Sequence, residues 1–175
     1  RGISARRGGI AVRTAPSSGA LFATELYLVA HDVPGLAPGV WRHDAASHAL
    51  EQVASLPFAA AGLPARAAAF VVATAVFARS GHKYGDRTWR YVVADLGHAL
   101  HNLQVAAIAL GLVPPRLLPA FDDEALAAAL GLDPRHEAVL AVAAFGSRDD
   151  DIARVAAPAR WVVPPLGAAG RAGTA

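Results

Sequence analysis

The longest regular pattern of apolar positions in the chain lies between Arg79 and Leu112. It predicts a helix of about two dozen residues, roughly 35 Å long at the helical rise of about 1.5 Å per residue. Gly111 ends the pattern, and Pro114 and Pro115 prevent its continuation. Apolar side chains recur at the three- and four-residue spacing of a helix at Tyr91, Val92, Leu96, Ala99, Leu100, Leu103, Ala106, Ala107 and Leu110.

Three other apolar runs predict buried strands. They span residues 20–30, 69–78 and 136–145, although the alanine content of 69–78 leaves a helix open there. Two shorter runs, 40–43 and 48–53, flank an Asp-Ala-Ala-Ser turn and predict an edge hairpin. Strands and helices mixed without regular alternation favour an α+β fold over a doubly wound one.

Smaller signals complete this picture. Asp122 or Asp123 is expected to cap a helix that runs through Leu130 and ends at Gly131. Residues 59–63 suggest a helical turn, and residues 115–119 an extended segment. The arginine- and glycine-rich residues 1–14 predict a loop or arm, residues 15–146 one domain, and residues 147–175 a tail that either wraps around a partner or is disordered.

Composition narrows the function classes. The formal net charge of +2 and the scattered arginines indicate neither a nucleic-acid nor a membrane partner. Cysteine is absent, which excludes disulfides and thiolate chemistry. The longest apolar run, 67–78, is too short to cross a bilayer and no secretory signal is visible, so we expect a cytoplasmic location. Methionine is absent as well, so the chain is expected to be a processed or N-terminally truncated piece of a longer protein.

Lys83 is a candidate reactive residue because it is the only lysine in a chain with 16 basic residues. The other basic residues are all arginine, which indicates that arginine stands in this chain wherever only a positive charge is needed. Arginine cannot replace lysine where a compact ammonium able to release its proton is required. Lys83 is followed by Tyr84, and the pair stands at the head of the long predicted helix. The alternative reading is an ordinary solvated lysine beside a turn.

Two further groups carry possible chemistry. The Thr14–Leu21 turn offers hydroxyls, backbone N–H groups and a glycine before a buried strand, which suits a phosphate, a ribityl chain or a flat ring, although such a turn is more often only a turn. His98 and His101 share one helix face with Asp95, but leucines interleave and a third or fourth ligand is missing. We therefore predict no metal site.

Four segments together resemble one known family. Residues 16–30, PSSGALFATELYLVA, resemble the PSAGALYPLELY segment of SagB-type dehydrogenases, a branch of the FMN-dependent nitroreductase superfamily that includes azoline dehydrogenases of thiazole/oxazole-modified peptide pathways. Residues 82–112 resemble that family's KYGDRGYRY…DAGHAAQNLLLAAAALGL. Residues 120–133 resemble its FDDDALAALLGLD, and residues 138–146 its AVLAVVAVG strand. The resemblance is collinear from about Arg13 to Gly146.

The resemblance implies a nitroreductase-like α+β fold with a central, mostly antiparallel sheet and helices on both faces. It also implies an interlocked homodimer with FMN at the dimer interface, a modified peptide as substrate, and biosynthetic enzymes as partners. Lys83 and Tyr84 match the family's pair implicated in azoline oxidation. The residues implied to contact the flavin are Ser17, Ser18, Gly19, Ala20, Pro119 and Ala120, with Arg160 as a weakly aligned phosphate ligand. Proline lacks an N–H, so only Ala120 could donate toward the flavin from its loop.

The sequence also departs from the family. The Arg-Arg-Ser-x-Arg segment that grips the FMN phosphate is missing, and Arg6 and Arg7 imitate it only loosely. Alternatives to an azoline dehydrogenase are therefore a general NAD(P)H-dependent nitroreductase or flavin reductase, and a non-catalytic scaffold of the same fold. The leading hypothesis places a flat redox ring between the serine-glycine turn and the amino end of the long helix, within reach of Lys83.

Overall fold

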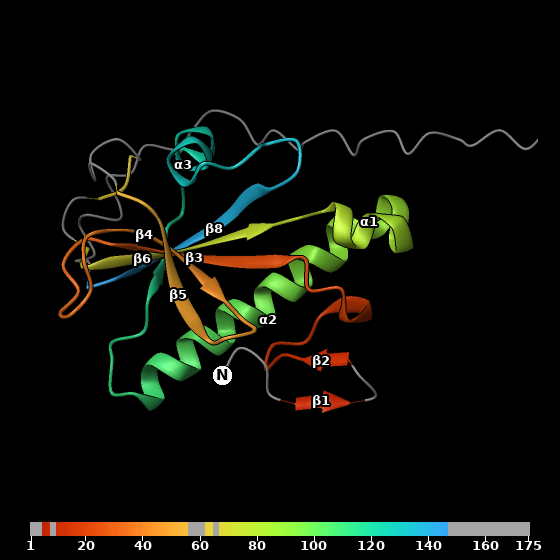
Figure 1. Cartoon of the computed structure of the whole chain (residues 1–175), viewed down its shortest axis with the longest axis horizontal. Coiled ribbons are helices and arrows are strands. Elements are labelled where there is room, and N and C mark those ends of the chain that lie inside the picture. Colours follow the sequence, from red (N-terminus) through yellow and green to blue (C-terminus); the bar gives the residue numbers. More distant parts are fainter. Residues whose placement is uncertain (1–4, 8–9, 56–61, 65–66, 147–175) are drawn as a thin grey trace, which may run out of the picture.

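A six-stranded antiparallel sheet forms the centre of the part of the chain that the computed structural model describes, residues 5–7, 10–55, 62–64 and 67–146 (Figure 1). Its strand order is β5-β4-β3-β6-β8-β7. The strands are β3 (Thr24–Ala30), β4 (Gly39–Asp44), β5 (Ala49–Ala54), β6 (Ala69–Ala75), β7 (Arg116–Leu117) and β8 (Ala138–Phe145). The helices are α1 (Ala78–Tyr84), α2 (Thr88–Ala109) and α3 (Asp123–Leu130), and a separate pair joins β1 (Ala5–Arg7) to β2 (Ile10–Val12).

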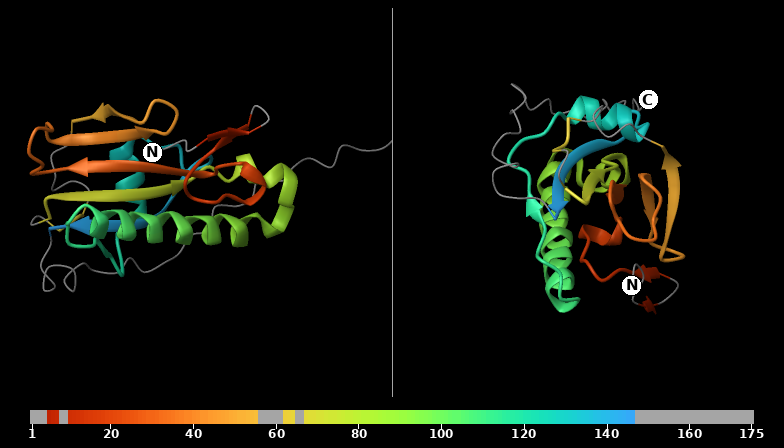
Figure 2. Two further views of the ribbon diagram at one scale, coloured as in Figure 1. Left: turned by 90° about the horizontal axis from the view of Figure 1, so that it is seen from below. Right: turned by 90° about the vertical axis from the view of Figure 1, so that its left-hand side faces the viewer.

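The two longer helices cover opposite faces of the sheet. In Figures 1 and 2 the sheet lies between α3 on one side and α2 on the other. The main core lies under α3, where Leu126 and Leu130 pack on apolar side chains that include Tyr27, Val29, Phe70, Val72 and Val142. A smaller cluster lies at α2, where Val92 packs with Ala23, Ala75, Phe77 and Leu140. The expected α+β fold, with an antiparallel sheet and helices on both faces, is confirmed.

Local signals explain most of the elements. Asp122 caps α3 by accepting a hydrogen bond from the Ala125 N–H at 2.8 Å, and Gly131 ends this helix in the left-handed conformation at φ +69°. The β4–β5 hairpin forms at the expected Asp-Ala-Ala-Ser turn, where Asp44 accepts from the Ala46 N–H at 2.9 Å. These elements were predicted because their stop and turn residues act within a few positions.

Three expectations differ from the structure. Residues 79–84, expected as a turn, form most of α1, so Lys83 and Tyr84 end a short helix instead of starting the long one. The strand expected from Ala20 begins only at Thr24, because Ala20 and Phe22 have positive φ values that a strand cannot contain. The arm expected at 1–14 contains the β1–β2 pair, which fits the strand preference of Ile10 and Val12. The turn expected at 59–63 lies largely outside the described residues.

A partly buried hydrogen-bond cluster at the main core links β3 and β6 to the residue before β8. Glu137, just before β8, accepts from the Tyr27 hydroxyl of β3 at 3.2 Å and also from the Thr74 hydroxyl of β6. Tyr27 and Thr74 are both buried. Burial, reinforced by the negative charge of Glu137 and by this hydrogen bond, raises the pKa of Tyr27 to about 12.

We predict a tyrosine-specific loss of stability in alkali. The folded state favours the neutral phenol of Tyr27. The contribution of Tyr27 to the free energy of unfolding is therefore complete below pH 10 and is lost as the pH rises toward about 12. Denaturant unfolding followed by tryptophan fluorescence should show a steeper loss between pH 10 and 12 in the wild type than in Tyr27→Phe. Absorbance near 295 nm should lack the step near pH 12 in Tyr27→Phe. Equal slopes and equal titrations would refute this assignment.

Candidate functional site

The serine-glycine turn is fixed by a buried carboxylate from the long helix. Asp95 of α2, only 9% exposed, accepts hydrogen bonds from the Ser17 hydroxyl at 3.1 Å, the Ser18 N–H at 2.8 Å and the Ser18 hydroxyl at 2.9 Å. Ser17 Oγ in turn accepts from the Phe22 N–H at 2.9 Å. Both serine hydroxyls, which we expected to face a ligand, therefore bind the protein itself. The exposed part of this turn is the Gly19–Ala20 peptide.

Gly19 brings the turn into direct contact with the candidate reactive pair. A Cβ atom placed on Gly19 would lie 2.6 Å from Tyr84 Oη and 2.8 Å from Lys83 Nζ. These two polar atoms therefore converge on one point of the turn, although their residues are more than sixty positions from it in sequence. In the described structure the ends of these two side chains occupy the space next to Gly19. The placement of a flat ring between the turn and the long helix stays a prediction.

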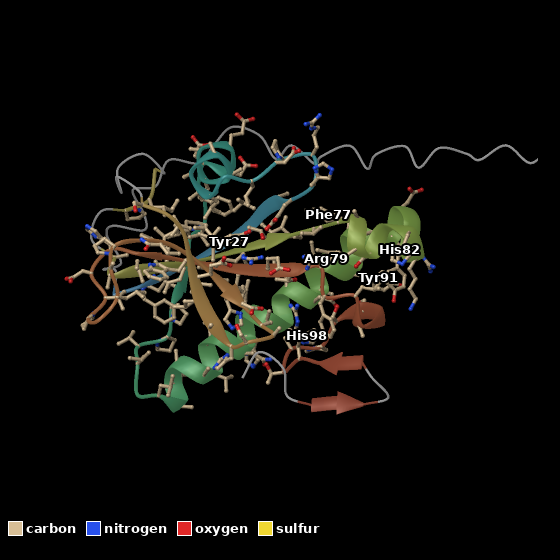
Figure 3. All side chains as sticks on the ribbon, in the orientation of Figure 1. Tyr27, Phe77, Arg79, His82, Tyr91 and His98 are labelled. Atoms are coloured by element: carbon tan, nitrogen blue, oxygen red, sulfur yellow. The ribbon has the colours of Figure 1, made fainter. Side chains whose placement is uncertain are left out.

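Helix α1 approaches the turn with two side chains one helical turn apart. Arg79 donates to the Phe22 carbonyl at 2.8 Å and forms an ion pair with Glu25 of β3. Lys83, four residues later, rests on Gly19. Figure 3 shows Arg79, His82 and Tyr91 at the end of the molecule occupied by α1. The ion pair of Arg79 thus fixes the base of the helix that presents Lys83.

Aromatic contacts join Lys83 and Tyr84 to the long helix α2. The Tyr84 ring lies 4.5 Å from the Tyr91 ring of α2, measured between centroids, and Lys83 Nζ lies 5.4 Å from the Tyr84 centroid. At this distance a cation–π contact joins the two neighbouring side chains. Phe77 stacks on Trp89 at 5.5 Å and joins the starts of α1 and α2. Lys83 is exposed and Tyr84 half-buried, so a ligand can reach both.

A small pocket of about 110 Å³ lies next to the turn. Its walls include Ser17, Asp95, Arg13 and His43. The Arg13 guanidinium lies 4.7 Å over the Phe22 ring, and burial lowers the pKa of Arg13. Burial, together with the neighbouring His48 and Arg13, also lowers the pKa of His43. Pockets that enclose drug-sized ligands span roughly 300–1,000 Å³, so this space cannot enclose a flavin.

The other expected contact residues lie elsewhere. Pro119 and Ala120 follow β7, and strands β6 and β8 separate β7 from β3 in the sheet. With neighbouring strands about 4.8 Å apart, the β7 edge of the sheet lies roughly 14 Å from β3, the strand that follows the serine-glycine turn. Arg160 lies outside the described residues, and nothing is described of the Arg6 and Arg7 side chains. Of the expected site residues, the described part of one chain therefore brings together the turn, Lys83 and Tyr84.

Two negative findings apply to the described part of the chain. No group of three or more histidine, cysteine, aspartate or glutamate residues there has the geometry to hold a metal ion. Asp95, which we considered beside His98 and His101, instead binds the serines. Across the same residues, none of the helices combines the length and the apolar character needed to traverse a bilayer.

Sequence reasoning missed two residues that shape the site, Asp95 and Arg79. Asp95 falls between Val92 and Leu96 on the buried stripe of the long helix, where the pattern requires an apolar residue. A carboxylate at such a position needs hydrogen-bond donors, and this was the available signal. Arg79 gave no comparable signal because its partners, Glu25 and the Phe22 carbonyl, come from a distant segment.

The sequence and the fold are similar to those of known proteins. Residues 9–147 match the profile described as the Nitroreductase family. A relative from Methanocaldococcus jannaschii and a crystal structure from Anabaena variabilis both carry the description "putative nitroreductase". The first is 30% identical over 131 residues, covering 70% of this chain and 65% of the relative. The second is 29% identical with a TM-score of 0.75, covering 89% of this chain and 34% of the other.

A third similarity is to a biosynthetic assembly. The structure of the E. coli microcin synthetase McbBCD complex, with truncated pro-MccB17 bound, contains a chain 25% identical to this one with a TM-score of 0.69. The match covers 85% of this chain and 60% of that one. The chain thus spans less than two thirds of each of these three proteins. Because the family profile matches well over half of its residues, the chain belongs to the nitroreductase family.

Proposed function

We propose that the chain forms the catalytic part of an FMN-dependent oxidoreductase that resembles the SagB-type dehydrogenases. The observation that carries the proposal is the convergence of Lys83 Nζ and Tyr84 Oη on Gly19, in the turn that the resemblance assigns to the flavin. Membership of the nitroreductase family supports a redox activity. Lys83 and Tyr84 are the proposed catalytic residues.

The residues at the turn fit a flavin ring. Gly19 and Ala20 are exposed, have positive φ values and carry no side chain larger than a methyl group, so a ligand can approach the backbone of their peptide. An ammonium and a phenol stand beside this peptide, and both suit the polar edge of an isoalloxazine. Ser17 and Ser18 support the turn from behind through Asp95. FMN would therefore lie on the outer side of the turn, beside Lys83, with Pro119, Ala120 and Arg160 as further proposed contacts.

The proposed reaction assigns proton handling to the protein. Oxidation of an azoline ring to an azole removes one hydride and one proton. When bound, FMN supplies the two-electron acceptor that this oxidation requires. A neutral amine or a phenolate at Lys83 or Tyr84 can take the proton, and such positioned groups contribute about 10²- to 10⁴-fold to rate. Their contact with Gly19 fixes both groups relative to the turn.

A modified peptide is the proposed substrate. The resemblance quoted above and the similarity to a chain of the peptide-bound McbBCD complex support it, and biosynthetic enzymes are the proposed partners. The rival is a general NAD(P)H-dependent nitroreductase or flavin reductase, which the descriptions of the two other similar proteins favour. A non-catalytic scaffold is the third candidate, since the expected phosphate-binding segment is missing.

One experiment separates these candidates. The purified chain is mixed with FMN, flavin uptake is measured by filtration and absorbance, and the complex is offered either an azoline-containing peptide or NADPH with a nitroarene. Flavin uptake with loss of two hydrogens from the peptide supports the dehydrogenase. Flavin uptake with NADPH oxidation and an unchanged peptide supports the reductase. Absence of flavin uptake supports the scaffold and overturns the proposal.

We propose a homodimer, with the carboxyl-terminal half of α2 at the interface. Here the helix and the following loop present a row of apolar side chains to solvent, at least half exposed in each case: Val105, Ile108, Leu110, Leu112 and Val113. Contiguous exposed apolar surface of this kind marks an interface. A second copy is the proposed occupant because the resemblance implies an interlocked homodimer, and because the described part of one chain brings together only the turn, Lys83 and Tyr84 among the expected site residues.

Ile108→Asp is expected to convert the dimer into a monomer. Ile108 is 62% exposed, so the substitution does not disturb the core, whereas burying an unpaired carboxylate at an interface costs several kcal/mol. Light scattering after gel filtration measures the mass. Leu50→Asp is the matched control, because Leu50 is a 41%-exposed apolar residue on the edge strand β5. A monomeric wild type, or a dimeric Ile108→Asp variant, would contradict the proposed interface.

A further inference from the structure

Asp95 is the only buried carboxylate among the residues that the structure describes, and the proposed chemistry does not use it. Its two oxygens accept three hydrogen bonds from two adjacent residues, Ser17 and Ser18. Bonds to a charged acceptor are roughly twice as strong as neutral ones. These bonds stand at the start of the Ser17–Phe22 segment, whose backbone geometry is unusual, and they indicate that Asp95 holds this segment in place.

The backbone of this segment needs to be held. Gly19 has φ +65°, Ala20 +55° and Phe22 +48°. Two of these left-handed residues carry a Cβ, and the left-handed region is disfavoured for such residues. Ser17 joins Asp95 to the strained part, because its hydroxyl donates to Asp95 and accepts from the Phe22 N–H. Asp95 therefore holds the segment directly at Ser18 and, through Ser17, at Phe22.

The held segment is the surface on which the reactive pair rests. Lys83 Nζ and Tyr84 Oη both pack against the Cα of Gly19, one residue after Ser18. From these contacts we infer that Asp95 is a positioning residue that fixes Lys83 and Tyr84 through the Ser17–Gly19 turn. As a statement about turnover this rests on the proposed function. As a statement about where Lys83 lies, it does not.

The composition provides a specific probe for this inference. Lys83 is the only lysine, so reductive methylation with ¹³C-formaldehyde labels one side chain plus the α-amino group, and Lys83→Arg identifies which signal is which. Asp95→Ala should shift the Lys83 methyl resonance toward that of the unfolded chain. Asp95→Asn should shift it less, because an amide oxygen still accepts from the Ser18 N–H. Asp133→Ala is the control, since Asp133 also holds a turn, accepting from the Arg135 N–H at 3.0 Å, but between α3 and β8.

Kinetics then test the route through the turn. Asp95→Asn should lower kcat about 10- to 100-fold, as expected when reacting groups are displaced by about 1 Å. Ser18→Ala should lower kcat as well. The variant that combines Asp95→Asn with Ser18→Ala should have a kcat no lower than that of the more affected single variant, because both substitutions break the same set of hydrogen bonds.

The outcomes are decisive in each direction. An unchanged Lys83 resonance in folded Asp95→Ala, with folding verified by circular dichroism, overturns the inference, and Asp95→Asn decides the same point if Asp95→Ala does not fold. Additive kinetic effects also overturn the route through Ser18. If the wild type shows no flavin-linked turnover, the proposed function fails while the resonance experiment still decides the role of Asp95.

Discussion

Lys83→Ala is expected to abolish substrate oxidation while FMN remains bound. The variant removes the only ammonium that contacts the serine-glycine turn in the described structure, and it leaves the turn held by Asp95. Loss of a positioned proton-transfer group lowers turnover about 10²- to 10⁴-fold. Because Lys83 is exposed, the free energy of unfolding should change by less than about 1 kcal/mol. Turnover and flavin absorbance of the same preparation check both parts.

Two further variants separate charge from proton transfer at this position. Lys83→Arg keeps a cation beside the Tyr84 ring but does not release a proton, so it should be nearly as inactive as Lys83→Ala. Arg90→Ala, which removes an exposed cation from the first turn of α2, should retain wild-type turnover. Wild-type turnover in flavin-loaded Lys83→Ala would remove Lys83 from the mechanism and leave Tyr84 as the remaining candidate.

The parts of the fold that were predicted from the sequence depend on local signals. The Asp122 cap and Gly131 define α3, and the apolar spacing defines the 22-residue helix α2. The hairpin β4–β5 follows from its turn residues. Each of these signals acts over a few positions, so a single sequence contains all of the information needed.

The parts that were not predicted depend on contacts between distant segments. Helix α1 contains Gly81 and has no side-chain cap, and the ion pair between Arg79 and Glu25 ties it to β3. Asp95 holds the left-handed turn at Ala20 through its hydrogen bonds to Ser17 and Ser18, which lie 78 and 77 positions earlier in the chain. Nothing in a local window reveals either contact. The candidate site lies where these two contacts meet, so its residues could be named from the resemblance, but their arrangement could not be derived.

Gly19→Ala should reduce turnover far more than it reduces stability. The added methyl would lie 2.6 Å from Tyr84 Oη and 2.8 Å from Lys83 Nζ, closer than real Cβ contacts permit. Both atoms are the ends of side chains that can move, so the clash displaces the reactive pair and leaves the fold intact. A displacement of about 1 Å at reacting groups costs on the order of 10²-fold in rate.

The backbone contribution can be separated with a second glycine. Gly19 has φ +65° and Gly131 has φ +69°, so alanine carries the same strain of about 1–2 kcal/mol at either position. Nothing lies within 4 Å of a Cβ on Gly131. Gly131→Ala should therefore lower the melting temperature by about the same few degrees as Gly19→Ala while keeping wild-type turnover. Equal turnover in the two variants would show that the contact between Gly19 and the Lys83–Tyr84 pair is irrelevant to catalysis, because strain is the only effect that they share.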